Sequence, residues 1–332
     1  MSFGFLAARN RQAGCLEPGT ILRPLVLCCL YFPCQAIPAP NPHPCERSLE
    51  LSALASGAQR AEMGGGWRTL ESLGVQAVKL CPQEGNGYRW LGLAYLRRGV
   101  TFASVRAFRA ALLYGDDATT HLRLAEAYFV LNQHQFFAEE IAAAKSKTPN
   151  DAEAYYVEGR FLFQTRNLYP EAAEQFRQAL ARDPKHIKAL SYLALSLKAM
   201  QQDSEAEQML QKSIQVNDAQ NGSFFLPYQA LASLYLEQDR AGDALPYVER
   251  AVKMTPGVAE NQFLLGKVAL ARSDTKTAES ALRVAIALDE SLIEARYLLA
   301  RLYQGRGDSA AANRELEKFK ELKEIYGTRR LR

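Results

Sequence analysis

The chain has 332 residues, of which 48% are apolar, enough for a buried core and too many for disorder of the whole chain. Its 40 Lys and Arg against 36 Asp and Glu give a net charge of +4 without long runs of one sign, unlike a dedicated nucleic-acid binder. Four histidines and six cysteines leave few residues for a metal centre or a catalytic triad, so no catalytic residue, metal site or cofactor is predicted.

Residues 1–45 form a head whose composition differs from the rest of the chain. It holds seven of the 14 prolines and five of the six cysteines; because only Cys81 lies beyond it, no disulfide is expected in the body. Three arginines precede the apolar stretch 25–32, and small residues follow at Ala36 and Ala39, the order typical of a secretory signal peptide. The stretch is too short to span a membrane. We expect a signal peptide cut near Ala36 or Ala39, and hence export to a periplasmic or extracytoplasmic location.

The alternative is a disordered head on a cytoplasmic protein. Pro24 and Pro33 interrupt the apolar run, and the charged region before it is long, which favours this alternative. If export holds, translation begins close to Arg23, and an intact Met1 on the mature chain would end the export interpretation.

Residues 46–84 are interpreted as a degenerate capping repeat in front of a regular array. An Ala- and Ser-rich helix is expected over 46–62, followed by a loose glycine turn over 63–66 and a second helix that ends before Pro82. Terminal repeats are often atypical because one of their faces must tolerate water.

From residue 85 to 326 the chain repeats itself seven times. Each unit places a Gly or Ala at the same point of a first predicted helix, at spacings of 33 to 38 residues. These anchor residues are Gly92, Ala125, Gly159, Ala194, Ala232, Gly266 and Ala300. A second predicted helix in each unit carries small residues seven apart with one large apolar residue between them. The large residues are Phe108, Ile141, Phe176, Leu210, Val248, Leu282 and Leu316. Since small residues let helices approach and large ones fill the remaining space, each unit is predicted to be an antiparallel helical hairpin.

These residues resemble the tetratricopeptide-repeat (TPR) family, whose 34-residue unit carries Leu-Gly, Tyr, Ala, an aromatic residue, Ala and Pro in that order. The resemblance covers about three quarters of the chain. It implies an all-α fold, a right-handed superhelix of about seven to eight hairpins. It also implies a non-catalytic protein-protein interaction scaffold that binds an extended peptide or partner segment in the concave groove.

Three departures from the pattern carry their own predictions. Phe137 stands where other units have a small residue, so helix packing is expected to shift there. One extra residue near 168–170 is interpreted as a turn insertion. Four extra residues within 217–223 make a longer connector, which is predicted to be the hinge of the array.

The family's ligand-facing positions follow the aromatic position and the anchor residue of each first helix. The groove residues predicted on this basis are Arg89, Tyr156, Arg160, Phe263, Lys267, Tyr297 and Arg301. Six of them form three ring–cation pairs at i,i+4 spacing, which suits a peptide with apolar and acidic groups. The alternative is that the charges are solvated and merely cover the rings. The family's carboxylate clamp is not supported, because Leu93, Leu195 and Ser233 replace its Asn.

The last helix, expected over 310–326 before a basic tail at 327–332, presents charged residues over Leu316, Phe319 and Leu322. A second hypothesis follows from this cap: a structural adaptor, or a self-associating component of an envelope-associated complex, that acts through its convex face or its ends. No nucleic acid and no integral membrane span are predicted among the interactions of either candidate.

Overall fold

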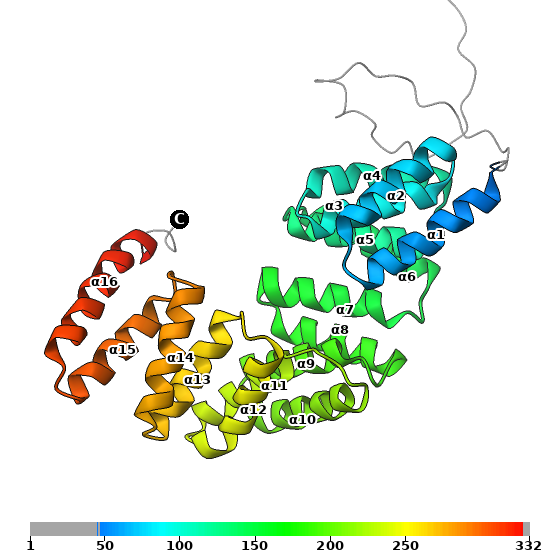
Figure 1. The fold of residues 1–332 in the computed structure, drawn as a ribbon. Coiled ribbons are helices and arrows are strands. Elements are labelled where there is room, and N and C mark those ends of the chain that lie inside the picture. Colours follow the sequence, from blue (N-terminus) through cyan, green and yellow to red (C-terminus); the bar gives the residue numbers. More distant parts are fainter. Residues whose placement is uncertain (1–44, 46, 328–332) are drawn as a thin grey trace, which may run out of the picture. The chain divides into compact units, whose positions relative to one another are not determined.

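The computed structural model describes Cys45 and residues 47–327. The predicted signal peptide and the basic tail beyond Gly327 lie outside the described residues. Within that part there are sixteen α-helices and one short π-helix, and no strand (Figure 1). In chain order they are α1 (Ser48–Met63), α2 (Trp67–Leu80), α3 (Gly85–Arg97), α4 (Thr101–Tyr114), α5 (Ala118–Val130), α6 (His134–Lys147), α7 (Ala152–Phe161), η1 (Leu162–Arg166), α8 (Tyr169–Arg182), α9 (Ile187–Ala199), α10 (Asp203–Ala219), α11 (Leu226–Glu237), α12 (Ala241–Met254), α13 (Ala259–Ala271), α14 (Thr275–Leu288), α15 (Ile293–Gly305) and α16 (Ser309–Gly327).

The helices pair into eight antiparallel hairpins, from α1 with α2 to α15 with α16. Each odd-numbered helix packs against the even-numbered helix that follows it, and most even-numbered helices then pack against the next hairpin. The predicted all-α array of seven to eight repeats is confirmed, and the hairpin of α1 and α2 is its first member.

The anchor residues let the two helices of a hairpin touch. A Cβ added to Gly92 would lie 2.6 Å from the ring of Phe108, and one added to Gly159 would lie 2.7 Å from the ring of Phe176. Both distances are below van der Waals contact, so no larger residue fits unless its neighbour moves. The partners of these glycines are the large residues that the sequence pattern singled out on the second helices.

All eight hairpins turn in the same way. Each has one residue with a left-handed backbone at the end of its first helix. Seven of these eight helix ends are closed by a 6→1 hydrogen bond, and the fourth, after η1, is closed by a bond from Leu168 to Leu162. The left-handed residues are Gly65, Gly99, Asn132, Asn167, Gln201, Asp239, Ser273 and Gly307. In the third hairpin, for example, the amide of Gln133 donates to the carbonyl of Tyr128 at 2.9 Å.

Two of the predicted irregularities are located differently in the structure. The extra residue of the fourth hairpin widens the end of its first helix into η1, and does not lengthen the turn at 168–170. The connector at 217–223 is shorter than expected, because α10 continues through Ala219, and the side chain of Asn217 is fully buried. The Asn217 amide donates to the carbonyl of Gly222 and to the Tyr228 hydroxyl, both at 3.3 Å, and this fixes the connector.

The packing shift predicted at Phe137 is present at the junction of α6 and α7. The backbones of these two helices stay farther apart than at the other junctions between consecutive hairpins. The ring of Phe137 is buried and stacks on that of Phe161 at a centroid distance of 4.0 Å. Aromatic rings therefore fill the space that small residues close elsewhere.

A disulfide joins Cys45 to Cys81, with Cα atoms 5.7 Å apart. The expectation that the body lacks disulfides was wrong, because it counted Cys45 with the head. The bond links Cys45, three residues before α1, to Cys81, directly after α2, and so closes the first hairpin. The two cysteines are 36 residues apart in the sequence, so the crosslink restricts the unfolded chain and thereby stabilises the first hairpin.

Candidate functional site

The odd-numbered helices form the inner side of the stack. Successive odd-numbered helices from α3 to α13 contact one another directly, and no pair of successive even-numbered helices in the described part makes a comparable contact. Elements that approach more closely on one side of a stack lie on its inner side. The candidate groove is therefore lined by α3, α5, α7, α9, α11 and α13, and α15 is the next odd-numbered helix at its end.

The predicted groove residues all lie on odd-numbered helices. They come from α3, α7, α13 and α15, with α9 and α11 between the second and third of these, so the structure spreads them along the stack and does not gather them in one cluster. Tyr297 is 42% exposed and Tyr156 only 3% exposed.

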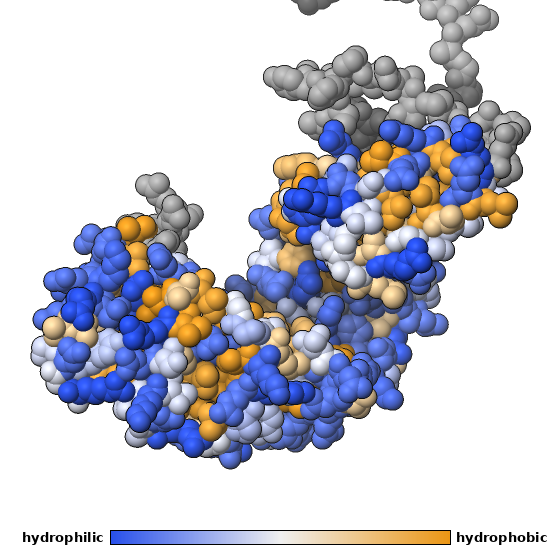
Figure 2. Space-filling model, viewed as in Figure 1, coloured by the Kyte–Doolittle hydropathy of each residue, from blue (hydrophilic) through white to orange (hydrophobic). Residues whose placement is uncertain are grey.

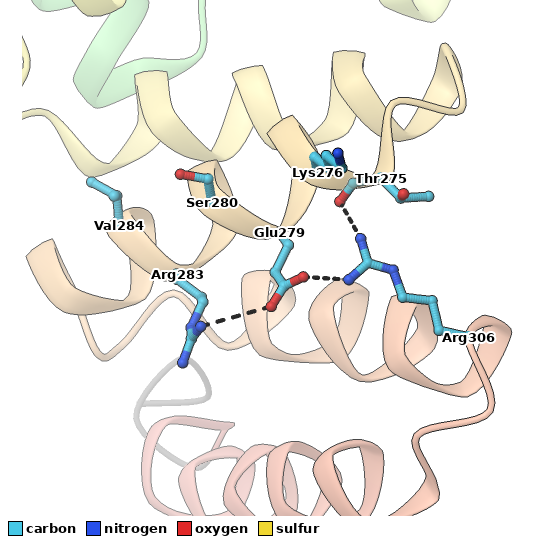
Figure 3. A pocket seen from close by; sticks show the side chains of 7 residues that line it. All are labelled: Thr275, Lys276, Glu279, Ser280, Arg283, Val284 and Arg306. Carbon is cyan, nitrogen blue, oxygen red and sulfur yellow. Dashed lines mark hydrogen bonds and ion pairs between the residues drawn. The ribbon is translucent and has the colours of Figure 1, made fainter.

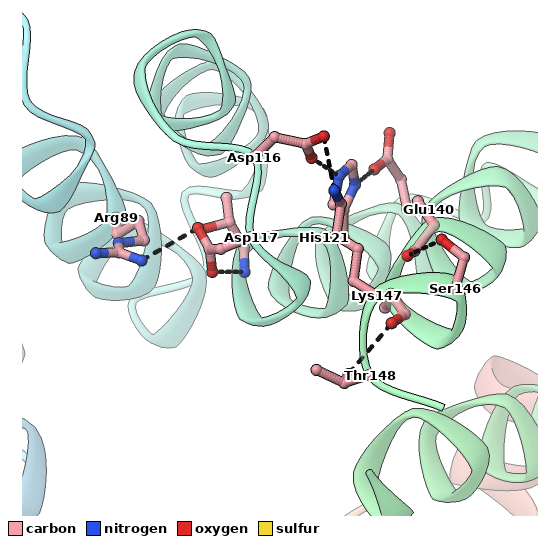
Figure 4. Close-up of polar contacts among 11 residues, drawn as sticks. Arg89, Asp116, Asp117, His121, Glu140, Ser146, Lys147 and Thr148 are labelled. Carbon is pink, nitrogen blue, oxygen red and sulfur yellow. Dashed lines mark hydrogen bonds and ion pairs between the residues drawn. The ribbon is translucent and has the colours of Figure 1, made fainter. Parts of the chain in front are cut away.

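Arg89 joins two hairpins. Its guanidinium lies 3.1 Å from the carboxylate of Asp117 and also donates to the side chain of Asn86 (Figure 4). Asp117 in turn caps α5, accepting from the amide of Thr120 at 2.9 Å. Arg89 therefore already has a carboxylate partner within the protein.

Arg160 has no such partner. Its guanidinium lies over the ring of Phe129, 5.0 Å from the centroid, and its Nε is buried without a hydrogen bond in the part of the chain that the structure describes. Tyr156, one turn earlier, packs against the rings of His186 and Tyr192 at 5.0 and 5.9 Å. Burial raises the pKa of Tyr156 to about 12, so its hydroxyl stays neutral at physiological pH. Tyr156 is therefore a buried, neutral side chain, and Arg160 is a cation without a carboxylate partner in the described part of the chain.

The three predicted ring–cation pairs have different outcomes. Lys267 lies over its predicted partner Phe263, with Nζ 5.8 Å from the centroid. Arg160 instead uses Phe129 from the preceding hairpin. The ring of Tyr297 packs against Phe319 of α16 at 5.5 Å, and no ring contact of Arg301 occurs among the described residues.

The sequence reasoning missed an aromatic group at the end of α7. The ring of Phe163 meets those of Tyr169 and Tyr192 at 5.4 and 5.8 Å, and Gln164 donates to the Tyr192 hydroxyl at 3.3 Å. Phe129 and Phe163 both stand four residues after an anchor residue, so a search of that position would have found both.

A second polar cluster surrounds His121, which is 4% exposed (Figure 4). Its Nδ1 lies 2.5 Å from a carboxylate oxygen of Glu140, and its Nε2 lies 2.6 Å from one of Asp116. Lys147 donates to the other oxygen of Asp116 at 2.7 Å. The hydrogen bond to Glu140 is the main cause of a raised His121 pKa, with Asp116 acting in the same direction and burial opposing both. The cluster ties the turn before α5 to α6, which is a structural role.

A shallow pocket lies on α14 and the end of α15, away from the groove (Figure 3). Glu279 occupies its centre, pairs with Arg306 and lies 3.7 Å from Arg283. Arg306 also donates to the carbonyl of Thr275 at 2.8 Å. Arg306 is the main cause of the lowered Glu279 pKa, so this carboxylate is charged and already paired. Because it is charged, Glu279 cannot act as a proton donor in this pocket.

No group of three or more His, Cys, Asp or Glu side chains that could hold a metal ion occurs among the described residues. Within the same residues, no helix is long and apolar enough to cross a membrane.

The tetratricopeptide-repeat family model matches residues 137–187 and 230–292. Together with the eight hairpins and their anchor residues, this match shows that the chain is a tetratricopeptide-repeat protein. Proteins of this family are protein-interaction scaffolds and are typically non-catalytic. No curated protein matches the sequence significantly.

Three solved structures share the fold. The Cut9–Hcn1 hetero-tetramer of APC/C aligns at a TM-score of 0.65 and 15% identity, over 77% of this chain and 49% of that one. PilF of Pseudomonas aeruginosa aligns at 0.57 and 22% identity, over 65% and 97% of the two chains. A tetratricopeptide-repeat protein of Parabacteroides merdae aligns at 0.54 and 19% identity, over 77% and 99%. At these identities the likeness concerns the fold alone.

Proposed function

We propose that this protein is a non-catalytic scaffold that binds an extended peptide or partner segment along its odd-numbered helices. The observation that carries the proposal is a set of three cations, Arg160, Lys267 and Arg301. Each lies on an odd-numbered helix, and none has an ion pair with an acidic residue in the described part of the chain. Unpaired cations on the inner side of a repeat stack suit carboxylates supplied by a ligand.

The rings beside these cations indicate the rest of the ligand. Phe129 and Phe263 are half-buried under Arg160 and Lys267, so each site offers apolar surface next to a positive charge. A peptide that carries both acidic and apolar side chains would pair with both features. Arg89 is expected to contribute less to ligand binding, because its guanidinium already forms an ion pair with Asp117.

The test is charge reversal of the groove with a matched control. The variant R160E/K267E/R301E changes three groove cations, and K212E/K253E/K320E changes three exposed lysines on α10, α12 and α16 by the same total charge. Affinity purification from the source cell, followed by comparison of the captured proteins, is the measurement. We expect the groove variant to lose its partner and the control to keep it, with unchanged circular dichroism for both. Equal capture by both variants would move the binding site elsewhere.

The alternative of self-association through the last helix is not favoured by the packing of its apolar residues. Phe319 packs on Tyr297, and Leu322 is 8% exposed. These two side chains therefore offer little apolar surface to a second copy.

We also propose that the protein is exported. The order of charged, apolar and small residues in the head supports this, and so does the Cys45–Cys81 disulfide, because disulfides persist mainly in oxidising compartments. Amino-terminal sequencing of the mature protein should begin after Ala36 or Ala39. A chain that still begins at Met1 would favour the cytoplasmic alternative.

A further inference from the structure

The second hairpin, α3 with α4, concentrates the positive charge of the protein. Residues 85–114 contain five arginines and neither Asp nor Glu. Since the whole chain carries +4 and this hairpin +5, the rest of the chain has a net charge of −1. The net positive charge of the chain is therefore accounted for by this one hairpin.

Neighbouring hairpins neutralise only part of this charge. Arg89 pairs with Asp117 of the following hairpin, and Arg98 with Glu71 of the preceding one. The other three, Arg97, Arg106 and Arg109, are exposed and have no ion pair with any described residue.

Two of these unpaired arginines lie on a single face of α4. Phe102, Arg106, Arg109 and Leu113 follow one another at spacings of four, three and four residues, which places them on one stripe of an α-helix. Phe102 is 76% exposed and Leu113 is 53% exposed. These four residues, called here the α4 face, combine two exposed apolar side chains with two unpaired guanidinium groups between them. Figure 2 shows hydrophobic and hydrophilic surface side by side over the region of α1 to α4.

We propose that the α4 face binds an acidic, amphipathic helix of a partner protein. Guanidinium groups pair carboxylates in two-pronged hydrogen bonds, so unpaired arginines on a helix without acids select acidic side chains. The face is one helix wide and about 16 Å long, which matches a single partner helix whose apolar residues meet Phe102 and Leu113. A membrane surface would need apolar side chains spread over a plane, and this stripe has two.

This face is separate from the candidate groove. It belongs to an even-numbered helix, whereas the groove is lined by odd-numbered helices. The protein can therefore hold a second partner while the groove is occupied.

The test uses a synthetic helical peptide of about 18 residues with leucines along one stripe and glutamates beside them. A second peptide replaces every glutamate by glutamine. Fluorescence anisotropy compares the binding of both peptides to the full chain, to R106E/R109E and to the control R272E/R314E. The control reverses two exposed arginines without ion pairs in the described part of the chain, on or beside α13 and α16, and so gives the same change in net charge.

We expect the glutamate peptide to bind about tenfold more tightly than the glutamine peptide, and R106E/R109E to lose about tenfold in affinity. The control should stay within about twofold of the unchanged protein. Phe102→Ala should weaken binding without changing the fold, because its ring is exposed. Equal loss in R106E/R109E and in the control would overturn the proposal, as would equal binding of the two peptides. Binding to vesicles of phosphatidylserine and phosphatidylcholine that depends on Arg106 and Arg109, without binding to the peptide, would replace it by a membrane contact.

Discussion

The α2–α3 and α6–α7 junctions join consecutive hairpins in opposite ways. At the first, backbones touch: a Cβ added to Gly74 would lie 3.0 Å from the carbonyl oxygen of Gly87, and one added to Gly87 would lie 2.9 Å from the amide nitrogen of Val78. At the second, the helices stay apart and the stacked rings of Phe137 and Phe161 fill the space.

The two kinds of contact differ in how easily they separate. Contact between backbones is rigid and needs no side-chain ordering, whereas contact through rings depends on rotamers that must be fixed on folding. Since the rings carry most of the packing between α6 and α7, we expect the stack to separate there before it separates at α2–α3.

The largest loss in the free energy of unfolding is expected for Phe161→Ala. This ring is 6% exposed and meets the rings of Phe137 and Phe129, so its removal leaves a cavity at the junction. The cost should be about 3–5 kcal/mol, and the hairpins on the two sides should unfold separately. Urea unfolding followed by amide hydrogen exchange measures both.

The exposed Phe102 provides the control for that experiment. The same change at Phe102 should alter the free energy of unfolding by less than about 0.5 kcal/mol. A single cooperative transition in the Phe161→Ala protein would show that the α6–α7 junction is no weaker than the others.

The stability of the α2–α3 junction, where Gly74 and Gly87 let the backbones touch, should be sensitive to one added methyl group. In Gly87→Ala the new methyl would meet the backbone of Val78 and the Cβ of Ala77, 2.9 and 3.0 Å away, and backbone cannot rotate aside. We expect a loss of about 1–3 kcal/mol. Gly242→Ala on α12 is the matched change, because nothing lies within 4 Å of the new methyl, and it should be neutral or stabilising by up to about 1 kcal/mol. Similar results for both variants would remove the argument for backbone contact.

The sequence predicted the parts of this fold that depend on residue size. Gly92 with Phe108 and Gly159 with Phe176 could be found because a small and a large residue must alternate wherever helices touch. Phe137 was recognised as an exception for the same reason. The widened helix end at η1 could not be placed, because one extra residue fits a turn or a helix end equally well in the sequence.

The candidate site was less predictable. Local spacing gave the Phe263–Lys267 pair correctly, since both residues lie on one helix. Local spacing could not show that Arg160 lies over Phe129, or that Arg89 forms an ion pair with Asp117, because these partners come from neighbouring hairpins. Contacts between repeats depend on how the hairpins stack, which the spacing within one helix does not contain.

The His121 cluster should make the third hairpin sensitive to alkaline pH. Its raised pKa means that the folded protein holds the imidazole proton more tightly than the unfolded chain, whose pKa is near 6.5. The resulting stability is fully present below pH 6.5 and is lost as pH rises through the folded pKa. Urea unfolding between neutral and mildly alkaline pH should show this loss, and His121→Asn should abolish it. Glu140→Gln removes the main cause of the shift, so its alkaline loss should be smaller. An unchanged slope in His121→Asn would assign the pH dependence to another group.

Asp116 should make the stability of the same cluster fall at acidic pH. Lys147 is the main cause of its lowered pKa, followed by His121, so its contribution is present above the ordinary pKa of 3.8. That contribution is lost as pH falls through the lowered value. Lys147→Gln should move this acid loss to higher pH in the same unfolding measurement.

The smallest effect is expected at the hairpin turns, which are alike across both kinds of junction. Ser273 has φ of 61°, a backbone conformation that costs a residue with a Cβ about 1 kcal/mol and costs glycine little. Ser273→Gly should therefore stabilise the protein by a few tenths to about 1 kcal/mol, since part of the gain is offset by the greater freedom of glycine in the unfolded chain. Gly99, which has φ of 75° at the matching turn, gives the reverse test: Gly99→Ser should lose a similar amount. If both changes behave in this way, the Gly99 and Ser273 turns obey the same backbone preference, and turn chemistry does not distinguish these two hairpins.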